Sequence, residues 1–222
     1  MTPLPPGGPD RPSWIVELRE RLASPPPRRL AGPVAAELRQ AAVLVPLDVD
    51  AGELWTVLTK RTDTLPSHPS QIAFPGGSRE AGEDAWTAAL REAREEVGLD
   101  PAHVLRLGEL DEQDVPSGFR IVPCVGAIPH PYELHPSEAE IAEVIRLPLT
   151  AFTNPRLVEE RPVVYDGVRR NLRIYHVGSR QIWGVTAQIL HSLLERLGLG
   201  GPAEPCDFRR RIIDQKRLAL RR

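Results

Sequence analysis

The chain has few of the residues that mark secreted, membrane-spanning or cysteine-based proteins. Its two cysteines, Cys124 and Cys206, lie far apart and form no CxxC pair, so neither a disulfide framework nor a cysteine zinc site is indicated. No apolar stretch approaches the roughly 20 residues that span a bilayer, and the N-terminus lacks the apolar run of a secretion signal. We therefore expect a soluble, cytoplasmic protein that does not bind membranes.

An excess of charge of one sign is also absent. The formal net charge is −2, which gives no general attraction to nucleic acid, so no nucleic-acid partner is expected and the ligand must be inferred from a local site. No Ser-His-Asp or Cys-His arrangement is identifiable, so no side chain is indicated as a nucleophile. In any bond-cleaving reaction of this chain, water is therefore the expected attacking group. Zinc is not indicated, because five histidines show no metal-ligand spacing: His103, His130, His135, His176 and His191.

The 222 residues, 41% hydrophobic and 26% charged, are typical of one globular domain with appendages. Residues 1–33 are rich in proline and predict a loosely attached leader with a short helix over residues 14–22. The main domain is expected over residues 34–200. The arginine-rich tail, residues 201–222, favours a solvated basic helix, with contact to a partner subunit or an acidic ligand as the alternative. The oligomeric state stays open, a homodimer included.

Short apolar runs separated by turn residues predict more strands than helices. Two helices are expected, one over residues 84–97 and one over residues 182–197, each with a glycine just past its end. Asp166 and Gly167 are a hairpin-turn pair between two of the strands. The expected strands cover residues 41–48, 54–60, 104–110, 121–128, 144–147, 163–165 and 172–176.

The helix over residues 84–97 carries an unusual acidic cluster. Glu92, Glu95 and Glu96 are spaced i, i+3 and i+4, so a helix places all three carboxylates on one face. Such like charges repel, whereas Mg²⁺ favours oxygen ligands. Arg91 stands four residues before Glu95 and can orient a carboxylate without binding metal. By themselves these residues also fit a solvated acidic face.

The segment before this helix favours a metal site over that alternative. Gly76 and Gly77 follow the strand-like residues QIAF, and glycine permits a tight turn that aims a backbone carbonyl or amide at a metal or phosphate. Gly82 and Glu83 then lead into the helix. Strand, glycine turn and acidic helix together predict a compact site for metal and phosphoanhydride.

Residues 77–99, GSREAGEDAWTAALREAREEVGL, resemble the Nudix box, G-x5-E-x7-R-E-U-x-E-E-x-G-U with U aliphatic. Every glycine and charged position matches, and only Ala93 is smaller than the usual aliphatic residue. The matching residues are Gly77, Glu83, Arg91, Glu92, Glu95, Glu96 and Gly98.

The resemblance implies an α/β fold, specifically the Nudix-type α/β/α sandwich with a mixed β-sheet. It also implies an enzyme that hydrolyses a nucleoside diphosphate linked to another moiety. Carried over by position, Glu92, Glu95 and Glu96 would ligate Mg²⁺ or Mn²⁺ with the backbone carbonyl of Gly76. Arg91 and Glu83 would hold the loop and helix together.

The catalytic base stays open at this point. One of the three box glutamates, or an acid from outside the box, would activate the attacking water. The outside candidates are Glu140 and Glu143, where the chain enters an expected strand, and ordinary surface glutamates are the alternative reading of both.

Beyond the box, the likeness narrows to the coenzyme A pyrophosphatase branch of the family. Residues 58–77, LTKRTDTLPSHPSQIAFPGG, are similar to the branch motif LLTxR[SA]x3Rx3Gx3FPGG, and residues 182–190 resemble the start of its C-terminal helix. The implied reaction converts coenzyme A or acyl-coenzyme A to 3′,5′-ADP and 4′-phosphopantetheine or its acyl form. Pro66 replaces the motif's arginine and Ser70 its glycine. The candidate substrate contacts are Lys60, Arg61, His68, Phe74 and Arg79.

Two alternatives remain. One is a Nudix enzyme for another nucleotide derivative, such as ADP-ribose, NADH or a nucleoside triphosphate. The other is a non-catalytic Nudix domain that senses a ligand, against which the intact glutamates argue, because a domain that only binds has no need of a complete metal site.

Overall fold

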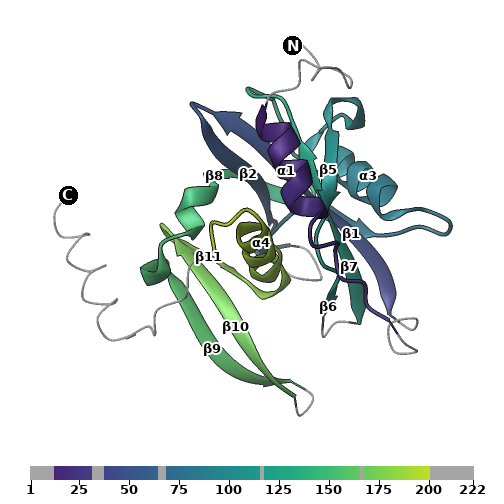
Figure 1. Cartoon of the computed structure of the whole chain (residues 1–222). Helices are drawn as coiled ribbons and strands as arrows, with labels where there is room; N and C mark the ends of the chain where they lie inside the picture. Colours follow the sequence, from purple (N-terminus) through teal and green to yellow (C-terminus); the bar gives the residue numbers. More distant parts are fainter. Residues whose placement is uncertain (1–12, 32–37, 65–68, 116–117, 166–167, 201–222) are drawn as a thin grey trace, which may run out of the picture.

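The computed structural model describes residues 13–31, 38–64, 69–115, 118–165 and 168–200. This part of the chain forms two β-sheets with helices packed against them (Figure 1). Three short 3₁₀ segments connect strands: η1 (Pro101–His103), η2 (Leu149–Phe152) and η3 (Pro155–Leu157). None of the described helices is long and apolar enough to cross a membrane.

The larger sheet is mixed. Its central strand β1 pairs in parallel with β7, whereas β2 and β4 pair with β1 in antiparallel fashion. The order is β3-β2-β1-β7-β5, with β4 on β1, β6 on β7 and β8 on β2. The strands are β1 (Arg39–Asp50), β2 (Glu53–Arg61), β3 (Ile72–Ala73), β4 (Gly76–Ser78), β5 (Leu105–Glu109), β6 (Gln113–Val115), β7 (Phe119–Ala127) and β8 (Ile141–Pro148).

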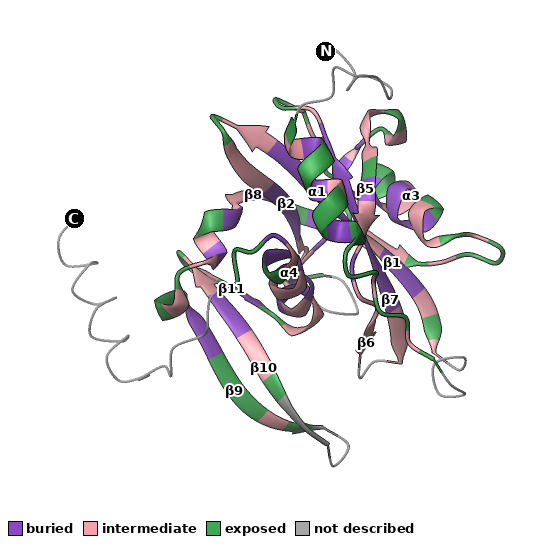
Figure 2. Cartoon of the chain, viewed as in Figure 1, coloured by how far each residue is buried: buried purple, intermediate pink, exposed green. Residues whose placement is uncertain are grey.

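Helices cover both faces of this sheet. The side chains of β1 alternate between two hydrophobic clusters, one on each face. Ala42 and Leu44 face helix α3 (Ala85–Val97). Val45 and Leu47 face the cluster that contains helices α1 (Ser13–Ala23) and α4 (Gly184–Arg196). Figure 2 shows buried residues concentrated where helices and sheet meet. The expected α/β/α layering with a mixed sheet is confirmed.

The smaller sheet has the order β11-β10-β9, formed by β9 (Val158–Tyr165), β10 (Val168–Val177) and β11 (Arg180–Trp183). Tyr165 pairs with Val168, so β9 and β10 flank residues 166 and 167, the expected hairpin-turn pair, which lie outside the described residues. Figure 1 shows the far ends of β9 and β10 extending away from the main sheet.

The second helix was predicted to begin at Ile182, and that start is wrong. Ile182 belongs to β11, where it pairs with Tyr175 and is fully buried. The helix begins at Gly184, whose φ of 66° reorients the backbone after the strand. Apolar spacing alone could not separate the two elements, because Ile182 is buried in a strand instead of on a helix face.

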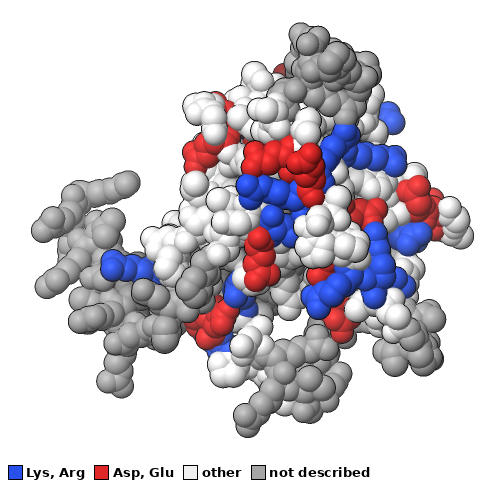
Figure 3. All heavy atoms as spheres, viewed as in Figure 1, with Lys and Arg blue, Asp and Glu red and all other residues white. Residues whose placement is uncertain are grey.

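The leader is not loosely attached in its described part. Ile15, Leu18 and Leu22 of α1 are at most 4% exposed and pack in the core, and Arg28 pairs with Asp111 in the loop after β5. The helix covers apolar side chains of β5 and β7 that would otherwise face water. Over the face drawn in Figure 3, basic and acidic side chains lie next to one another instead of forming large patches of one sign. The domain boundaries near residues 33 and 200 stay predictions, and the tail, residues 201–222, lies outside the described residues.

Candidate active site

Helix α3 is defined by its end residues, as the sequence predicts. Asp84 caps its start, since one carboxylate oxygen accepts a hydrogen bond from the Thr87 backbone N–H at 2.7 Å, and this bond lowers the pKa of Asp84. Gly98 ends it with φ 69°, donating to the Arg94 carbonyl at 3.0 Å. Ala88 and Ala93 are fully buried, so small side chains bring the helix close to the sheet.

Gly76 and Gly77 do not form the expected tight turn. They lie in the short strand β4, which pairs with β1, and glycine is needed there for close approach. A Cβ on Gly76 would stand 2.4 Å from the Ala42 carbonyl oxygen. A Cβ on Gly77 would stand 2.5 Å from the carboxyl carbon of Glu92. The two glycines therefore let β4 pack directly against β1 and an acidic residue of α3.

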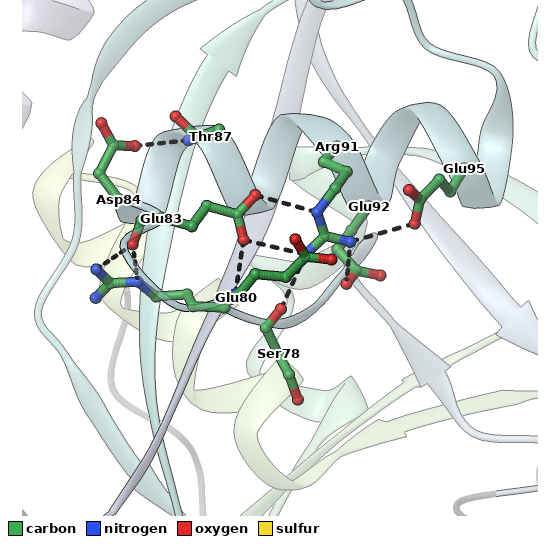
Figure 4. A network of polar contacts seen from close by, with 9 residues as sticks. Ser78, Glu80, Glu83, Asp84, Thr87, Arg91, Glu92 and Glu95 are labelled. Carbon is green, nitrogen blue, oxygen red and sulfur yellow. Dashed lines mark hydrogen bonds and ion pairs between the residues drawn. The ribbon is translucent and has the colours of Figure 1, made fainter.

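Arg91 connects Glu83, just before α3, to two acidic residues within the helix, Glu92 and Glu95 (Figure 4). Its guanidinium lies 3.1 Å from Glu83, 2.9 Å from Glu92 and 3.2 Å from Glu95, and it donates to the Ser78 carbonyl at 3.0 Å. The hydrogen bond to Glu83 is the main reason that the pKa of Arg91 is raised. Arg91 is thus placed to orient Glu92 and Glu95 without being a metal ligand itself.

Glu83 fastens the loop to the helix from the other side. Its carboxylate accepts from Arg91 and from the Glu80 backbone N–H at 2.9 Å, and these bonds lower its pKa. Its carbonyl accepts from the Arg79 guanidinium at 2.9 Å. The loop-to-helix contacts expected of Arg91 and Glu83 are present (Figure 4).

Glu96 is the most deeply placed of the acids, with 4% of its surface exposed. Burial raises its pKa to about 7, opposed by the Gly76 N–H at 3.3 Å and by Arg61, and further raised by Glu92 and Glu140. Burial is also the main reason that the pKa of Glu92 is raised, although Arg91 opposes it. Burial therefore disfavours the charged form of both carboxyl groups, and a cation placed beside them would favour that form.

The three box carboxylates do not converge on one point. Within the part of the chain that the structure describes, no group of three or more His, Cys, Asp or Glu residues is arranged to hold a metal ion. Glu92 and Glu95 turn toward Arg91, and Glu96 turns toward Gly76. The donor chemistry nevertheless fits Mg²⁺ or Mn²⁺, because the ligands are all oxygens and a divalent cation would offset the charge buried at Glu92 and Glu96.

The two outside acids lie in different environments. Glu140 immediately precedes β8 and is close enough to raise the pKa of both Glu92 and Glu96. Glu143 is in β8 and forms an ion pair with Arg180 of β11. Strand alternation places Glu143 on the side of Ile145, which packs in the α1 and α4 cluster, opposite α3. Glu143 therefore lies away from the three box glutamates, and Glu140 is the outside acid that lies near them.

The candidate substrate contacts are not gathered in one place. Arg61 lies beside Glu96, with Nη1 3.5 Å from Oε1. Lys60 lies opposite Glu143 on β8 and shares its side of the sheet, away from α3. Phe74 is 3% exposed and packs in the core.

Arg79 and His68 are the other two candidate substrate contacts. Arg79 borders an open hollow that is also lined by Arg39, Ser78 and Glu80, next to the loop before α3. His68 lies outside the described residues, as does Pro66. Arg180, which forms the ion pair with Glu143, was missed by the sequence analysis, because a single arginine at the start of a strand carries no signal of its partner.

With this geometry in place, comparisons with known proteins identify the family. The NUDIX domain matches residues 38–166. A protein called "Uncharacterized Nudix hydrolase NudL" from Photorhabdus laumondii is 34% identical over 174 residues, covering 78% of this chain and 90% of that one. A protein of the same name from Cronobacter sakazakii is 39% identical over 163 residues, covering 72% and 83%. The MutT/nudix family protein from Enterococcus faecalis aligns with a TM-score of 0.48 at 17% identity, covering 82% and 69%.

The chain belongs to the Nudix family. It is a Nudix hydrolase, an enzyme that cleaves a pyrophosphate linkage. Enzymes of this family generally use divalent metal ions.

Proposed function

We propose that this Nudix hydrolase uses Mg²⁺ or Mn²⁺ to cleave coenzyme A or acyl-coenzyme A into 3′,5′-ADP and 4′-phosphopantetheine or its acyl form. The observation that carries the metal-dependent part is the burial of Glu96 beside Glu92, because two such carboxylates are stable in their charged form only with a cation next to them. The choice of substrate is supported by the likeness of residues 58–77 and 182–190 to the coenzyme A branch.

Glu92, Glu95 and Glu96 would hold the metal together with the Gly76 carbonyl. When bound, the ion would screen the pyrophosphate charge and lower the pKa of a coordinated water. Arg91 keeps Glu92 and Glu95 on the same side of α3, so that both can turn to the ion.

The remaining steps use this chain's own side chains. Arg61, at the edge of the acidic cluster, would bind a substrate phosphate oxygen. Glu140 would accept a proton from the attacking water as its oxygen bonds to phosphorus. The bond between that phosphorus and the bridging oxygen breaks, and the second phosphate leaves with the bridging oxygen.

The test is a substrate panel analysed by mass. The protein is incubated with magnesium and coenzyme A, acyl-coenzyme A, NADH, ADP-ribose or nucleoside triphosphates, and products are identified by mass spectrometry. Release of 4′-phosphopantetheine and 3′,5′-ADP supports the proposal. Faster turnover of another member of the panel would move the specificity to that substrate, and no turnover of any member would argue for a ligand-sensing domain.

Two variants test the metal site. Glu95→Gln and Glu96→Gln remove one negative ligand each and should lower kcat on the order of 100-fold or more while the fold is retained. Glu138→Gln is the matched control, because Glu138 is an exposed acid close in sequence to Glu140. Near wild-type turnover of the Glu95 and Glu96 variants at saturating magnesium would rule out this assignment.

A further inference from the structure

Arg61 has a position that a simple phosphate contact does not explain. It stands at the end of β2, where the pairing with β8 is irregular. The extra residue lies in β8 and not in β2, because Lys60 pairs with Glu143 and Arg61 pairs with Ile141. Regular alternation along β2 puts Arg61 on the same face as Val57, which packs in the α3 cluster. Here the side chain points to the α3 side of the sheet, and its Nη1 lies 3.5 Å from Oε1 of Glu96.

Arg61 and Glu96 form an isolated ion pair. Of the described residues, Arg61 is the one cation that an ion pair joins to Glu96, whose other oxygen accepts from the Gly76 N–H. The 3.5 Å separation is longer than a well-formed hydrogen bond, so the pair is held by charge more than by directed bonding. Glu96 is thus balanced by one weakly bonded guanidinium.

Arg61 also has an unmet hydrogen-bonding demand. Its Nε is buried and has no hydrogen-bond partner among the described residues, and the side chain is 23% exposed. A guanidinium presents five N–H donors in a planar fork that matches two oxygens of a phosphate or carboxylate. Glu96 satisfies this fork poorly, which leaves donors for an anionic ligand.

A divalent ion on Glu96 and the Arg61 guanidinium compete for the same carboxylate. Two cations that share one carboxylate repel each other, so each weakens the binding of the other when no further anion is present. A substrate phosphate changes this relation, because it brings negative charge that both cations can contact. Coupling of this kind is reciprocal between the two ligands.

We propose that Arg61 is the counter-ion of Glu96 in the metal-free enzyme and a phosphate ligand in the substrate complex, so that it opposes metal binding alone and favours substrate binding. This inference rests on the proposed function of the same site. It assigns Arg61 two roles of opposite sign: the charge of Arg61 weakens metal binding in the absence of substrate, and its fork strengthens substrate binding in the presence of metal.

The first measurement is Mn²⁺ binding to the full chain without substrate, followed by the electron paramagnetic resonance signal of free Mn²⁺. Arg61→Met removes the charge and keeps an unbranched side chain. The variant should bind Mn²⁺ roughly 3- to 10-fold more tightly than wild type, the range that corresponds to losing one partly exposed ion pair. The same variant should have a KM for the pyrophosphate substrate raised about 10-fold or more, because a charged hydrogen-bond partner of phosphate is lost.

Two further variants separate the causes. Arg61→Lys keeps the charge but lacks the fork, so Mn²⁺ affinity should stay near that of wild type while KM rises. Arg94→Met is the matched control. Arg94 is an exposed cation on α3, two residues from Glu96 in sequence, with no ion pair to it, and its removal should change Mn²⁺ affinity less than about 2-fold.

The outcomes distinguish this inference from the proposed function. Wild-type protein that binds no Mn²⁺ contradicts the proposed metal site itself. If wild type binds Mn²⁺ and Arg61→Met binds it equally or more weakly, the counter-ion role is wrong. If Mn²⁺ binding tightens while KM stays unchanged, the phosphate role is wrong. Tighter Mn²⁺ binding in a variant also shows that the site is still folded, and Arg61→Lys provides the same check at unchanged charge.

Discussion

Gly77 and Glu92 touch across the gap between β4 and α3, and the contact leaves no room for a side chain at residue 77. A Cβ there would lie 2.5 Å from the carboxyl carbon of Glu92 and 2.7 Å from its second oxygen. Glu92 is meanwhile held from the other side by Arg91 at 2.9 Å. The position of this carboxylate is therefore set by a glycine backbone and a guanidinium together.

This contact predicts the effect of Gly77→Ala. The added methyl group must displace the Glu92 carboxylate from Arg91, so we expect kcat to fall about 10-fold or more. The unfolding free energy should fall by only about 1 kcal/mol or less, because the end of a flexible side chain can move aside and a partly exposed ion pair is lost. Steady-state kinetics with magnesium and urea unfolding measure the two effects. Gly82→Ala is the control in the loop that follows β4, where no atom lies within 4 Å of a new Cβ but φ is 81°. It should cost about 1 kcal/mol of stability and leave kcat nearly unchanged; equal kinetic effects in both variants would contradict the contact argument.

Replacing Ser70 by glycine should stabilise the protein. Its φ is 57°, the left-handed region that glycine adopts without strain, and it stands where the coenzyme A branch motif has glycine. Serine thus occupies a backbone conformation here that favours glycine. Ser70→Gly should raise the unfolding free energy by about 1 kcal/mol, measured by urea or thermal unfolding. Thr64→Gly, at an exposed position in the same loop region with ordinary φ, should not stabilise.

Breaking the ion pair between Arg146 and Asp48, far from the catalytic residues, should cause a large loss of stability. Asp48 is 2% exposed and accepts from the Arg146 Nε at 3.0 Å, and the guanidinium carbon of Arg146 lies 4.2 Å from the centre of the Trp55 ring. Arg146→Met leaves a buried carboxylate without its main partner, which should cost about 3–5 kcal/mol. The double variant Asp48→Asn/Arg146→Met should recover part of this loss. Urea unfolding followed by tryptophan fluorescence measures both, and additive effects would contradict a direct pair.

Asp111 binds Arg28 of the leader, so its ionisation should make the docking of the leader depend on pH. Burial favours its protonated form, but hydrogen bonds from the Arg28 backbone and the Arg28 and Arg196 guanidinium groups outweigh burial and lower its pKa. A carboxyl group with a lowered folded-state pKa contributes stability above its unfolded pKa and loses it as pH falls through the folded value.

Asp111→Asn should therefore be less stable than wild type at pH 7, and the difference should shrink as pH falls below 3.8, the ordinary pKa of an aspartate side chain. Urea unfolding of both proteins at several pH values between 7 and 3 tests this. A difference that stays constant over this range would show that the charge of Asp111 does not contribute.

The sequence by itself determined α3 and its chemistry. Asp84, Gly98 and the i, i+3, i+4 spacing of the glutamates act within a few residues along the chain, so local rules predict the cap, the helix end and the acidic face. The strands β1 and β2 and the turn between them follow from equally local alternation of apolar and turn residues.

Tertiary structure decided what lies on either side of that helix. Glu140 and Glu143 are alike in sequence, and only the β-bulge and the face of β8 separate the acid beside Glu96 from the acid paired with Arg180. The docking of α1 likewise depends on apolar surface of β5 and β7, about 80 residues or more away in the chain. Contacts between distant segments are set by how the faces of sheets and helices meet, and residue spacing along the chain contains no record of that geometry.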